Sequence, residues 1–421
     1  MIERYPKLLV VVPESIGGNS ASSFTLTNLL AGWPKERVSI ITYKIPAGGF
    51  DQVHSHWLVR FPLLVGDPQK QNTRMARSSV DSIHGCRKKI QFLLNNRYLK
   101  NLTVNLLDLL PIPRLSSSFV RWLEQEYKPD LIYSWLGGVQ STRLVKQLSL
   151  RLQTSVVPHF MDDWLFLAQS APVLKRVRSM IIKREFLTML PVISRGIGIS
   201  PDMAKVYQKR LGIPMDYVAN GVEGTLLAKL RSRSYKPRSK VLNLCIIGRL
   251  DYGRDEVLEE VLKNLSHHGL SSCVRIHVYS NSDLTRIDRY DNVYSHRPPQ
   301  DSTLLELKKT IDCMLYVDSF SLEQISYFRY SFSAKIPLYL AMGVPILTVG
   351  PQEVYSVKYL DSCEVGPTIP SIDQTGRAVR GLLDATQQQL EGWGNRATDI
   401  ANRHHTIETQ RARFRSILGV R

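Results

Sequence analysis

The feature that most constrains the fold is an alternation of short apolar runs with amphipathic stretches, and it occurs twice along the chain. The first series of predicted strands lies at residues 7–13, 38–43, 129–135, 155–160 and 196–200. Stretches with helical spacing separate these strands, including 139–152 and 201–212, and a second series begins at residue 241. Strands that alternate with helices form parallel sheets through right-handed crossovers. The sequence therefore predicts an α/β protein with two Rossmann-like parallel-sheet domains.

The polar, basic stretch 224–240 separates the two series, and we predict that it is a linker. The predicted organisation is an N-terminal domain over residues 1–222, a C-terminal domain over 223–400 and a C-terminal helix over 401–421. Parallel sheets bind ligands at the carboxyl ends of their strands, and a cleft between two domains favours ligand binding. The candidate functional residues are therefore those that directly follow the strands.

The composition narrows the class of protein. The chain has 421 residues, of which 43% are hydrophobic and 22% charged, as in soluble globular proteins. No apolar run approaches the roughly 20 residues that span a bilayer. The first residues are too charged for a secretory signal and indicate a buried strand instead. The five cysteines show no C-x-x-C spacing, so we predict reduced thiols in a cytoplasmic protein.

Positive charge is concentrated in the N-terminal half. Residues 1–222 hold 29 lysines and arginines against 15 acidic residues, whereas the remainder holds 26 against 22. Two stretches carry most of the excess, 69–121 and 174–195, and in both the basic residues alternate with apolar ones at helical spacing. That pattern is typical of a helix on an anionic membrane surface. Nucleic acid and a solvated basic face are the alternatives, but no nucleic-acid motif is present.

A glycine pair follows the first predicted strand. Gly17 and Gly18 precede a helix that we expect to begin near residue 22. Glycines let a ligand approach the backbone and helix N-termini attract anions, so the pair is a candidate phosphate contact. The spacing does not match the G-x-G-x-x-G dinucleotide fingerprint, and a tight turn explains the pair equally well.

Two arginines follow the first strand of the second series. In IIGRLDYGRDE, Arg249 and Arg254 lie between that strand and the next predicted helix. A guanidinium group can donate two parallel hydrogen bonds to two phosphate oxygens, so both residues are candidates for binding a diphosphate. The alternative is that they form ion pairs with Asp251, Asp255 or Glu256.

A second candidate anion site lies farther along the C-terminal half. Ser331, Ser333 and Lys335 precede a predicted helix that ends at Gly343. Loop amides and a helix N-terminus attract anions, and Lys335 adds positive charge. We expect this site and the arginine pair to meet at the strand ends of one domain and to hold a nucleotide diphosphate together.

These motifs resemble those of the family-four glycosyltransferases of the GT-B fold, which use nucleotide sugars and retain anomeric configuration. The resemblance covers nearly the whole chain and rests on residues 199–223, on IIGRL followed by Arg254, and on KIPLYLAMGVPIL at 335–347. It implies two Rossmann-like domains that face each other across a cleft, with the C-terminal helix packing back on the N-terminal domain. It also implies that Arg249 and Arg254 clasp the donor diphosphate, with arginine at 254 where the family has lysine.

The sequence departs from the family at two carboxylates. Family members often carry paired glutamates, one near the transferred sugar and one at the nucleotide ribose, and Tyr330 and Leu338 occupy those positions here. The pattern S-x-K-x-x-x-Y-L-A-x-G is closer to one branch of the family. Glu323 or backbone groups are the candidates for holding the ribose.

The stretch VVPHFMDDW at 156–164 places a histidine and two aspartates at the end of a predicted strand. The resemblance implies a histidine here that faces the donor sugar and the acceptor, so His159, Asp162 and Asp163 are the candidate catalytic residues. A neutral imidazole can hydrogen-bond a sugar hydroxyl, and a carboxylate can fix its tautomer or orient the acceptor. The alternatives are a metal site and a polar loop rim. We predict no metal, because GT-B enzymes generally need none.

Together these features predict a cytoplasmic glycosyltransferase, peripheral on the inner face of the cell membrane. It would move a sugar from a nucleotide-diphosphate sugar to a lipid-linked or polysaccharide acceptor with retention, in the assembly of surface glycans or glycolipids. No cofactor is expected beyond the donor substrate. The alternatives are an enzyme with a soluble acceptor, a sugar-nucleotide epimerase, a nucleic-acid binder, and a non-catalytic partner subunit of the same fold.

Overall fold

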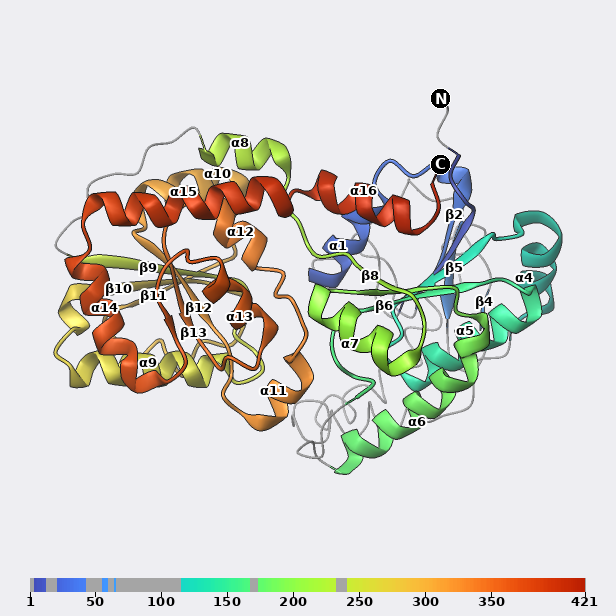
Figure 1. Cartoon of the computed structure of the whole chain (residues 1–421), viewed down its shortest axis with the longest axis horizontal. Coiled ribbons are helices and arrows are strands. Elements are labelled where there is room, and N and C mark those ends of the chain that lie inside the picture. The colour runs from blue at the N-terminus through green and yellow to red at the C-terminus, as the bar shows by residue number, and fades with distance from the viewer. Residues whose placement is uncertain are drawn as a thin grey trace, which may run out of the picture. The chain divides into compact units, whose positions relative to one another are not determined.

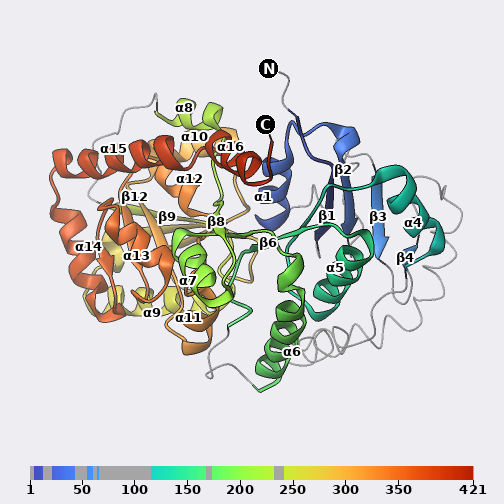
Figure 2. The same cartoon turned by 45° about the vertical axis from the view of Figure 1, so that its right-hand side comes forward.

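The chain forms two compact units (Figures 1 and 2). The structure is a computed structural model and describes residues 4–12, 21–42, 55–59, 64–65, 115–166, 173–231 and 241–420. One unit comprises Met1–Tyr217 with Phe414–Arg421, and the other comprises Val218–Arg413.

An eight-stranded sheet forms the centre of the N-terminal unit, with the strand order β4-β3-β2-β1-β5-β6-β7-β8. Only the β3–β4 pair is antiparallel; the other neighbours are parallel. Every residue of β1 and β6 is buried, as expected for parallel strands with both faces covered. The strands are β1 (Leu8–Val12), β2 (Val38–Thr42), β3 (Ser55–Val59), β4 (Leu64–Val65), β5 (Leu131–Ser134), β6 (Val156–Phe160), β7 (Gly196–Gly198) and β8 (Met215–Tyr217).

The helices of this unit follow the pattern of the sequence. In α7, the hydroxyl of Ser200 caps the helix by accepting the backbone N–H of Met203 at 3.1 Å, and Pro201 occupies the first turn. Gly212 ends the same helix. The helices are α1 (Ala21–Leu30), α4 (Ser117–Arg121), α5 (Val139–Leu152), α6 (Val173–Met189) and α7 (Pro201–Leu211).

A six-stranded sheet forms the centre of the C-terminal unit, with the order β11-β10-β9-β12-β13-β14 and every pair parallel. Two sheets of this kind confirm the predicted α/β architecture. The strands are β9 (Leu242–Ile247), β10 (Val274–Tyr279), β11 (Val293–His296), β12 (Cys313–Val317), β13 (Ile346–Val349) and β14 (Thr368–Ile369).

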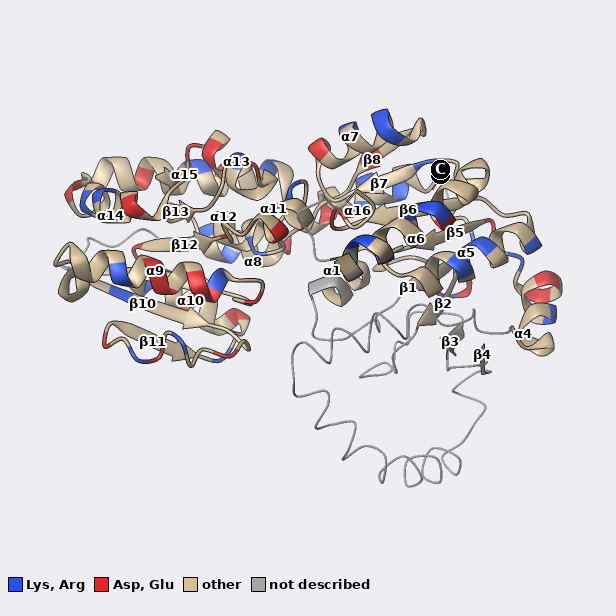
Figure 3. Cartoon of the chain, turned by 90° about the horizontal axis from the view of Figure 1, so that it is seen from below, with Lys and Arg blue, Asp and Glu red and all other residues tan. Residues whose placement is uncertain are grey.

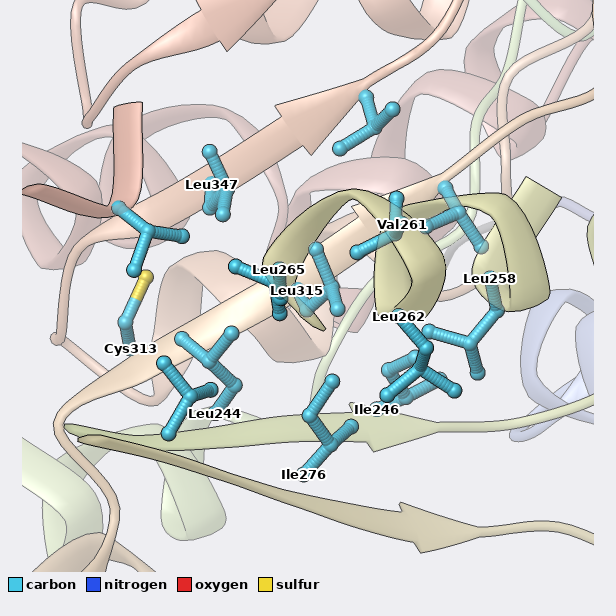
Figure 4. Packing of buried hydrophobic residues seen from close by; sticks show 14 of the residues in the cluster. Leu244, Ile246, Leu258, Val261, Leu262, Leu265, Ile276, Cys313, Leu315 and Leu347 are labelled. Atoms are coloured by element: carbon cyan, nitrogen blue, oxygen red, sulfur yellow. The ribbon is translucent and has the colours of Figure 1, made fainter. Parts of the chain in front are cut away.

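Helices cover both faces of this sheet. On one face, Leu258, Val261 and Leu262 of α9 pack among strand residues such as Leu244 and Leu315 in a single apolar cluster (Figure 4). On the other face, α12 places the Tyr339 ring 6.4 Å from that of Tyr316. The helices are α8 (Gly224–Arg231), α9 (Arg254–His267), α10 (Asp301–Thr310), α11 (Leu322–Phe328), α12 (Ile336–Ala341), α13 (Tyr355–Ser362), α14 (Thr375–Asp384) and α15 (Gln387–His404).

The predicted linker at 224–240 is wrong over its first half, because residues 224–231 form the helix α8. Leu226, Leu227 and Leu230 of this helix are buried. The ammonium of Lys308 on α10 donates to the carbonyl oxygen of Leu230 at 2.7 Å. The three leucines therefore form an apolar helix face within a stretch whose basic residues suggested a loop.

The last helix, α16 (Ile407–Ile417), returns to the N-terminal unit. The ring of Phe414 lies 5.1 Å from that of Tyr133 on β5 and 6.2 Å from that of Trp33, in edge-on geometry. Arg415 donates to the carbonyl oxygen of Ala31 at 3.2 Å. These contacts confirm that the C-terminal helix packs back on the N-terminal domain.

Four described cysteines are free thiols, namely Cys245, Cys273, Cys313 and Cys363, and Cys86 lies outside the described residues. Burial raises the pKa of the Cys245 thiol to about 12, so this thiol stays protonated at neutral pH. Within the described ranges, no helix has both the length and the apolar character needed to cross a membrane.

Candidate functional site

The strand ends of the C-terminal sheet bring a basic and an acidic residue together. Arg254 is the first residue of α9, and Asp318 directly follows β12. Arg254 donates from Nε to Asp318 Oδ1 at 3.1 Å, and Nη2 lies 3.1 Å from the same oxygen. Both side chains are almost fully buried. The pair therefore fixes the guanidinium at the edge of the sheet where parallel strands bind ligands.

Asp318 has further donors that fix its carboxylate. The hydroxyl of Tyr316 donates to Oδ2 at 2.9 Å, and the backbone N–H of Ser319 donates to Oδ1 at 3.1 Å. On the other side, the guanidinium carbon of Arg254 lies 5.0 Å from the centroid of the Phe328 ring, which α11 supplies. The orientation of Arg254 is thus set by both β12 and α11.

Lys335 lies beside this pair. Its side chain crosses Gly248, where an added Cβ would come within 3.3 Å of three side-chain carbons of Lys335. Gly248 has a φ of 112°, which favours glycine, and Lys335 Nζ lies 5.9 Å from the centroid of the Tyr316 ring. Burial, followed by repulsion from Arg254, lowers the pKa of Lys335 to about 7, although nearby carboxylates act in the opposite direction. Lys335 therefore titrates close to neutral pH.

Arg249 forms an ion pair with Asp251, one of the acidic partners considered from the sequence. Its Nε lies 2.6 Å from Asp251 Oδ2, and its side chain is 75% exposed. Asp251 also accepts a hydrogen bond from the hydroxyl of Ser282 at 3.0 Å. Arg249 is therefore an exposed cation in a pair that a ligand can open at little cost.

Sequence reasoning missed Asp318 as the partner of Arg254. The two residues are 64 positions apart, whereas the partners considered from the sequence were within a few residues. One of those, Asp255, pairs with Arg286 instead, at 3.2 Å. The sequence does contain a feature that points to Asp318. This residue directly follows the apolar run CMLYV, and the ends of predicted strands are where functional residues are expected.

The loop that carries Ser331 and Ser333 is fixed by Ser356 of α13. The Ser356 hydroxyl donates to the carbonyl oxygen of Ser331 at 3.0 Å and accepts the backbone N–H of Ser333 at 2.9 Å. The following helix, α12, begins at Ile336 and has six residues. The loop therefore anchors the backbone from which Lys335 projects toward Gly248.

The two positions at which the resemblance implied glutamates flank this loop. Tyr330 lies shortly after the end of α11, and Leu338 lies within α12; both are half-buried. Glu323 is in the first turn of α11. Neither of the two positions carries a carboxylate. Glu323 is the acidic side chain of α11.

In the N-terminal unit, His159 is buried at the end of β6. Its Nδ1 lies 2.7 Å from the hydroxyl of Tyr133 on β5, and the same hydroxyl accepts the indole N–H of Trp135 at 2.8 Å. Burial raises the pKa of Tyr133 above its usual range, so the hydroxyl keeps its proton. A Tyr133 hydroxyl that donates to Nδ1 fixes the neutral imidazole tautomer with its proton on Nε2.

Asp163 is also buried, and it accepts the hydroxyl of Tyr207 on α7 at 2.8 Å. Burial, and then the negative charge of Asp163, raise the pKa of Tyr207 well above its usual value. Asp162 is half-buried, and its carbonyl oxygen accepts the backbone N–H of Trp164 at 3.0 Å. All three candidates thus lie at the end of β6. His159 is hydrogen-bonded to Tyr133 of β5, and Asp163 is hydrogen-bonded to Tyr207 of α7.

Other candidates lie beyond the described residues. Gly17 and Gly18 are outside them, as is the basic stretch from residue 69 up to 114. The second basic stretch is described, and most of it forms α6. Among the described residues, no group of three or more His, Cys, Asp or Glu side chains is placed to hold a metal ion.

Comparison with known proteins identifies the fold. No protein-family model matches the sequence, and no curated protein does. The HepE protein of Anabaena in complex with UDP is similar over 98% of this chain and 99% of that chain, with 12% identity and a TM-score of 0.61. The UDP-forming α,α-trehalose-phosphate synthase of Burkholderia vietnamiensis covers 99% of both chains with 10% identity and a TM-score of 0.60.

The N-terminal domain of the trehalose-6-phosphate phosphatase of Candida albicans is similar over 99% of this chain and 97% of that chain, with 11% identity and a TM-score of 0.61. At such low identity these similarities show the fold alone. They confirm the fold that the resemblance implied, because the two parallel-sheet domains of this chain have the GT-B architecture.

Proposed function

We propose that the chain is a retaining glycosyltransferase, a divergent member of family four, that moves a sugar from a nucleotide-diphosphate sugar to a lipid-linked or polysaccharide acceptor. The observation that carries the proposal is the fixed Arg254–Asp318 pair with Lys335 beside it at the strand ends of the C-terminal sheet. Two neighbouring cations at that edge suit a diphosphate. Residues 223–400 would bind the donor, and residues 1–222 the acceptor.

The reaction places negative charge on the leaving nucleotide diphosphate as the glycosidic bond breaks. Arg254 and the protonated Lys335 would stabilise this charge from fixed positions, and Arg249 would add a third cation after leaving Asp251. The sugar becomes oxocarbenium-like, so the reaction needs no strong nucleophile from the protein. The loop at Ser331 and Ser333 would contribute backbone amides.

The N-terminal candidates would act on the sugar and the acceptor. His159, whose Nδ1 lies 2.7 Å from the Tyr133 hydroxyl, would hydrogen-bond a sugar hydroxyl, and Asp162 and Asp163 would orient the imidazole or the acceptor. Gly17 and Gly18 remain candidate phosphate contacts. We assign no general base, no metal and no cofactor.

The structural neighbours suggest which nucleotide to test first. The HepE structures hold UDP and glucose, or UDP-glucose, and the trehalose-phosphate synthases are UDP-forming. A uridine nucleotide is therefore our first choice for the donor of this chain.

The charge distribution supports a membrane setting for the acceptor. The N-terminal half carries 29 basic against 15 acidic residues. Positive charge attracts proteins to the anionic cytoplasmic leaflet. We therefore place the enzyme in the cytoplasm, peripheral on the inner face of the cell membrane, where it would extend a lipid-linked acceptor in the assembly of a surface glycan or glycolipid.

Thermal unfolding with UDP, GDP, ADP and TDP, each with and without magnesium, tests the donor site. A ligand present at about 100 times its Kd stabilises the folded state by roughly 2.7 kcal/mol. We expect one nucleotide to raise the Tm without magnesium and Arg249→Ala to reduce that shift. The exposure of Arg249 protects the variant from folding defects, and Arg377→Ala, on the exposed side of α14, is the matched control. If none of the four nucleotides raises the Tm, the proposal is contradicted.

One observation favours a second candidate, a non-catalytic partner subunit of the same fold. Tyr330 and Leu338 replace two glutamates that the family often uses at the sugar and the ribose. Such a subunit would bind nucleotide without consuming the donor. Release of nucleotide diphosphate from the matching nucleotide sugar by the purified chain, in the presence of acceptor lipid extract, would exclude this alternative.

A further inference from the structure

One face of α6 exposes large apolar side chains. Val173, Val177, Met180 and Leu187 are 74%, 43%, 68% and 41% exposed. Their spacing along the helix is i, i+4, i+7 and i+14, so they lie on one side of it, and the exposed Arg184 (i+11) lies between Met180 and Leu187 on the same side. We call these four residues the outer stripe of α6.

The opposite face of the same helix already packs into the N-terminal unit. Ile182, Phe186 and Met189 are buried there, and the Phe186 ring lies 5.6 Å from that of Phe160 on β6. A helix on the surface of a domain normally needs a single apolar face. The outer stripe is therefore a second apolar surface of α6, which the described residues of this unit leave exposed.

Cations flank the outer stripe. Arg176, Lys183 and Arg184 are exposed on that side of the helix. The single acidic residue of α6, Glu185, turns toward α5, where Arg143 and Lys146 lie 3.0 and 3.5 Å from its carboxylate oxygens. Figure 2 shows α5 and α6 side by side, and Figure 3 shows the basic residues of both helices. The described residues of the outward face thus carry positive charge and no acidic group.

Apolar side chains interspersed with lysine and arginine on one helix face match the boundary of an anionic bilayer. The apolar groups enter the region between headgroups and acyl chains, and the cations meet lipid phosphates. Nucleic acid would attract the cations but would gain nothing from the four apolar side chains. A second copy of the chain docked face to face would bring cations against cations.

We propose that the outer stripe of α6 and its flanking cations dock the N-terminal unit on an anionic lipid surface. The inference rests on the proposed function, since it names the surface on which a lipid-linked acceptor would be met. It assigns the membrane contact to one helix, with the long axis of α6 parallel to the bilayer and its Phe186 face turned toward the protein.

Co-sedimentation with vesicles of phosphatidylcholine, alone or mixed with phosphatidylglycerol, tests the docking surface. We expect the full chain to pellet with the anionic vesicles and to remain in solution with the neutral ones. Met180→Gln combined with Leu187→Gln should weaken binding by roughly tenfold for each side chain. Arg176→Gln combined with Arg184→Gln should weaken it about fivefold for each cation.

Matched controls come from the same unit. Leu150→Gln removes a side chain of α5 that is 59% exposed, and Lys205→Gln with Lys209→Gln removes two exposed cations of α7. We expect these controls to bind vesicles like the unmodified chain. Losses in the controls as large as those in the α6 variants would overturn the assignment to α6.

Thermal stabilisation by nucleotide, measured on the same variants, separates the two proposals. Nucleotide binding with no vesicle binding, or with unchanged binding by both α6 variants, overturns the docking surface and leaves the donor site standing. If the α6 variants lose vesicle binding but no nucleotide raises the Tm, the docking surface stands and the donor site is overturned. A preference for duplex DNA over vesicles, or a dimer in solution that Met180→Gln dissociates, would give the stripe a different occupant and overturn the proposal.

Discussion

Arg254 and Asp318 form an ion pair in which Nε and Nη2 of the guanidinium both lie 3.1 Å from Oδ1 of the carboxylate. They meet because β9 and β12 are parallel neighbours in the sheet and end at the same edge. Since Asp318 already offsets the charge of Arg254, the positive charge offered to a ligand depends on Lys335 as well. The pair therefore supplies geometry, and the lysine supplies much of the net charge.

Asp318→Asn should destabilise the C-terminal unit by about 3 kcal/mol, because removing one partner of a buried ion pair leaves the other charge uncompensated. Chemical denaturation measures the free energy of unfolding. Asp384→Asn, at the exposed end of α14, is the control and should change stability by less than about 0.5 kcal/mol. Equal effects of the two substitutions would show that the Arg254 pair is not buried in solution.

Lys335 should make stability depend on pH between about 7, its pKa in the folded state, and its ordinary value of 10.5. In that window the unfolded chain holds the proton and the folded chain does not, so the free energy of unfolding rises with pH. Lys335→Met should remove this contribution. We expect the variant to be more stable than the unmodified chain below pH 7 and to lose that advantage toward pH 10.5. The same difference in free energy of unfolding between the two proteins at every pH would show that folding does not lower the pKa of Lys335.

The same lysine should couple nucleotide binding to proton uptake. A bound diphosphate brings negative charge to Lys335 and raises its pKa, so binding just above pH 7 takes up a proton. Titration calorimetry in two buffers with different ionisation enthalpies measures that uptake. Lys335→Arg keeps the charge but cannot release its proton, so it should bind without uptake. Identical uptake by both proteins would place the titrating group elsewhere.

The parts of the fold that local pattern determines were predicted well from the sequence. The predicted helix at 139–152 coincides with α5, and the stretch ISPDMAKVYQKRLG predicted α7 through its cap, proline and final glycine. The two series of alternating strands and helices gave the two parallel sheets. Each of these features is carried by residues close together in the sequence.

Features that depend on distant contacts were not predictable in the same way. The stretch that forms α8 reads as a linker from its composition, because its three leucines become a buried face only when α15, α10 and α12 lie against the helix. The partner of Arg254 depends on the strand order, which places β12 beside β9 although β10 and β11 intervene in the sequence. Ser356 anchors the Ser331 loop from a different helix, again across the fold.

Tyr207→Phe should destabilise the N-terminal unit by about 1–3 kcal/mol. The substitution removes the hydroxyl that donates to Asp163 at 2.8 Å and leaves a buried carboxylate with one donor fewer. Denaturation monitored by tryptophan fluorescence measures the change, with Trp164 close to the site in sequence. Tyr252→Phe, at a 49% exposed tyrosine, is the control and should be nearly neutral. A neutral result for Tyr207→Phe would mean that solvent reaches Asp163.

Gly343→Ala should destabilise the C-terminal unit by about 2 kcal/mol or more. Gly343 follows α12 with a φ of 63°, and an added Cβ would lie 2.5 Å from the Thr398 hydroxyl oxygen on α15. Gly394, one turn earlier on α15, packs closely against the Gly343 carbonyl oxygen as well, so the two backbones are already in close contact. The glycine of the stretch KIPLYLAMGVPIL is thus required where α12 and α15 meet.

Gly381→Ala is the matched control for this prediction. Gly381 lies within α14, and no atom lies within 4 Å of an added Cβ. Alanine is favoured over glycine in a helix by about 0.5–1 kcal/mol, so this variant should be slightly more stable than the unmodified chain. Chemical denaturation of both variants measures the change in the free energy of unfolding. We expect a decrease for Gly343→Ala and a small increase for Gly381→Ala. No change for Gly343→Ala would mean that α12 and α15 do not pack as closely as the structure shows.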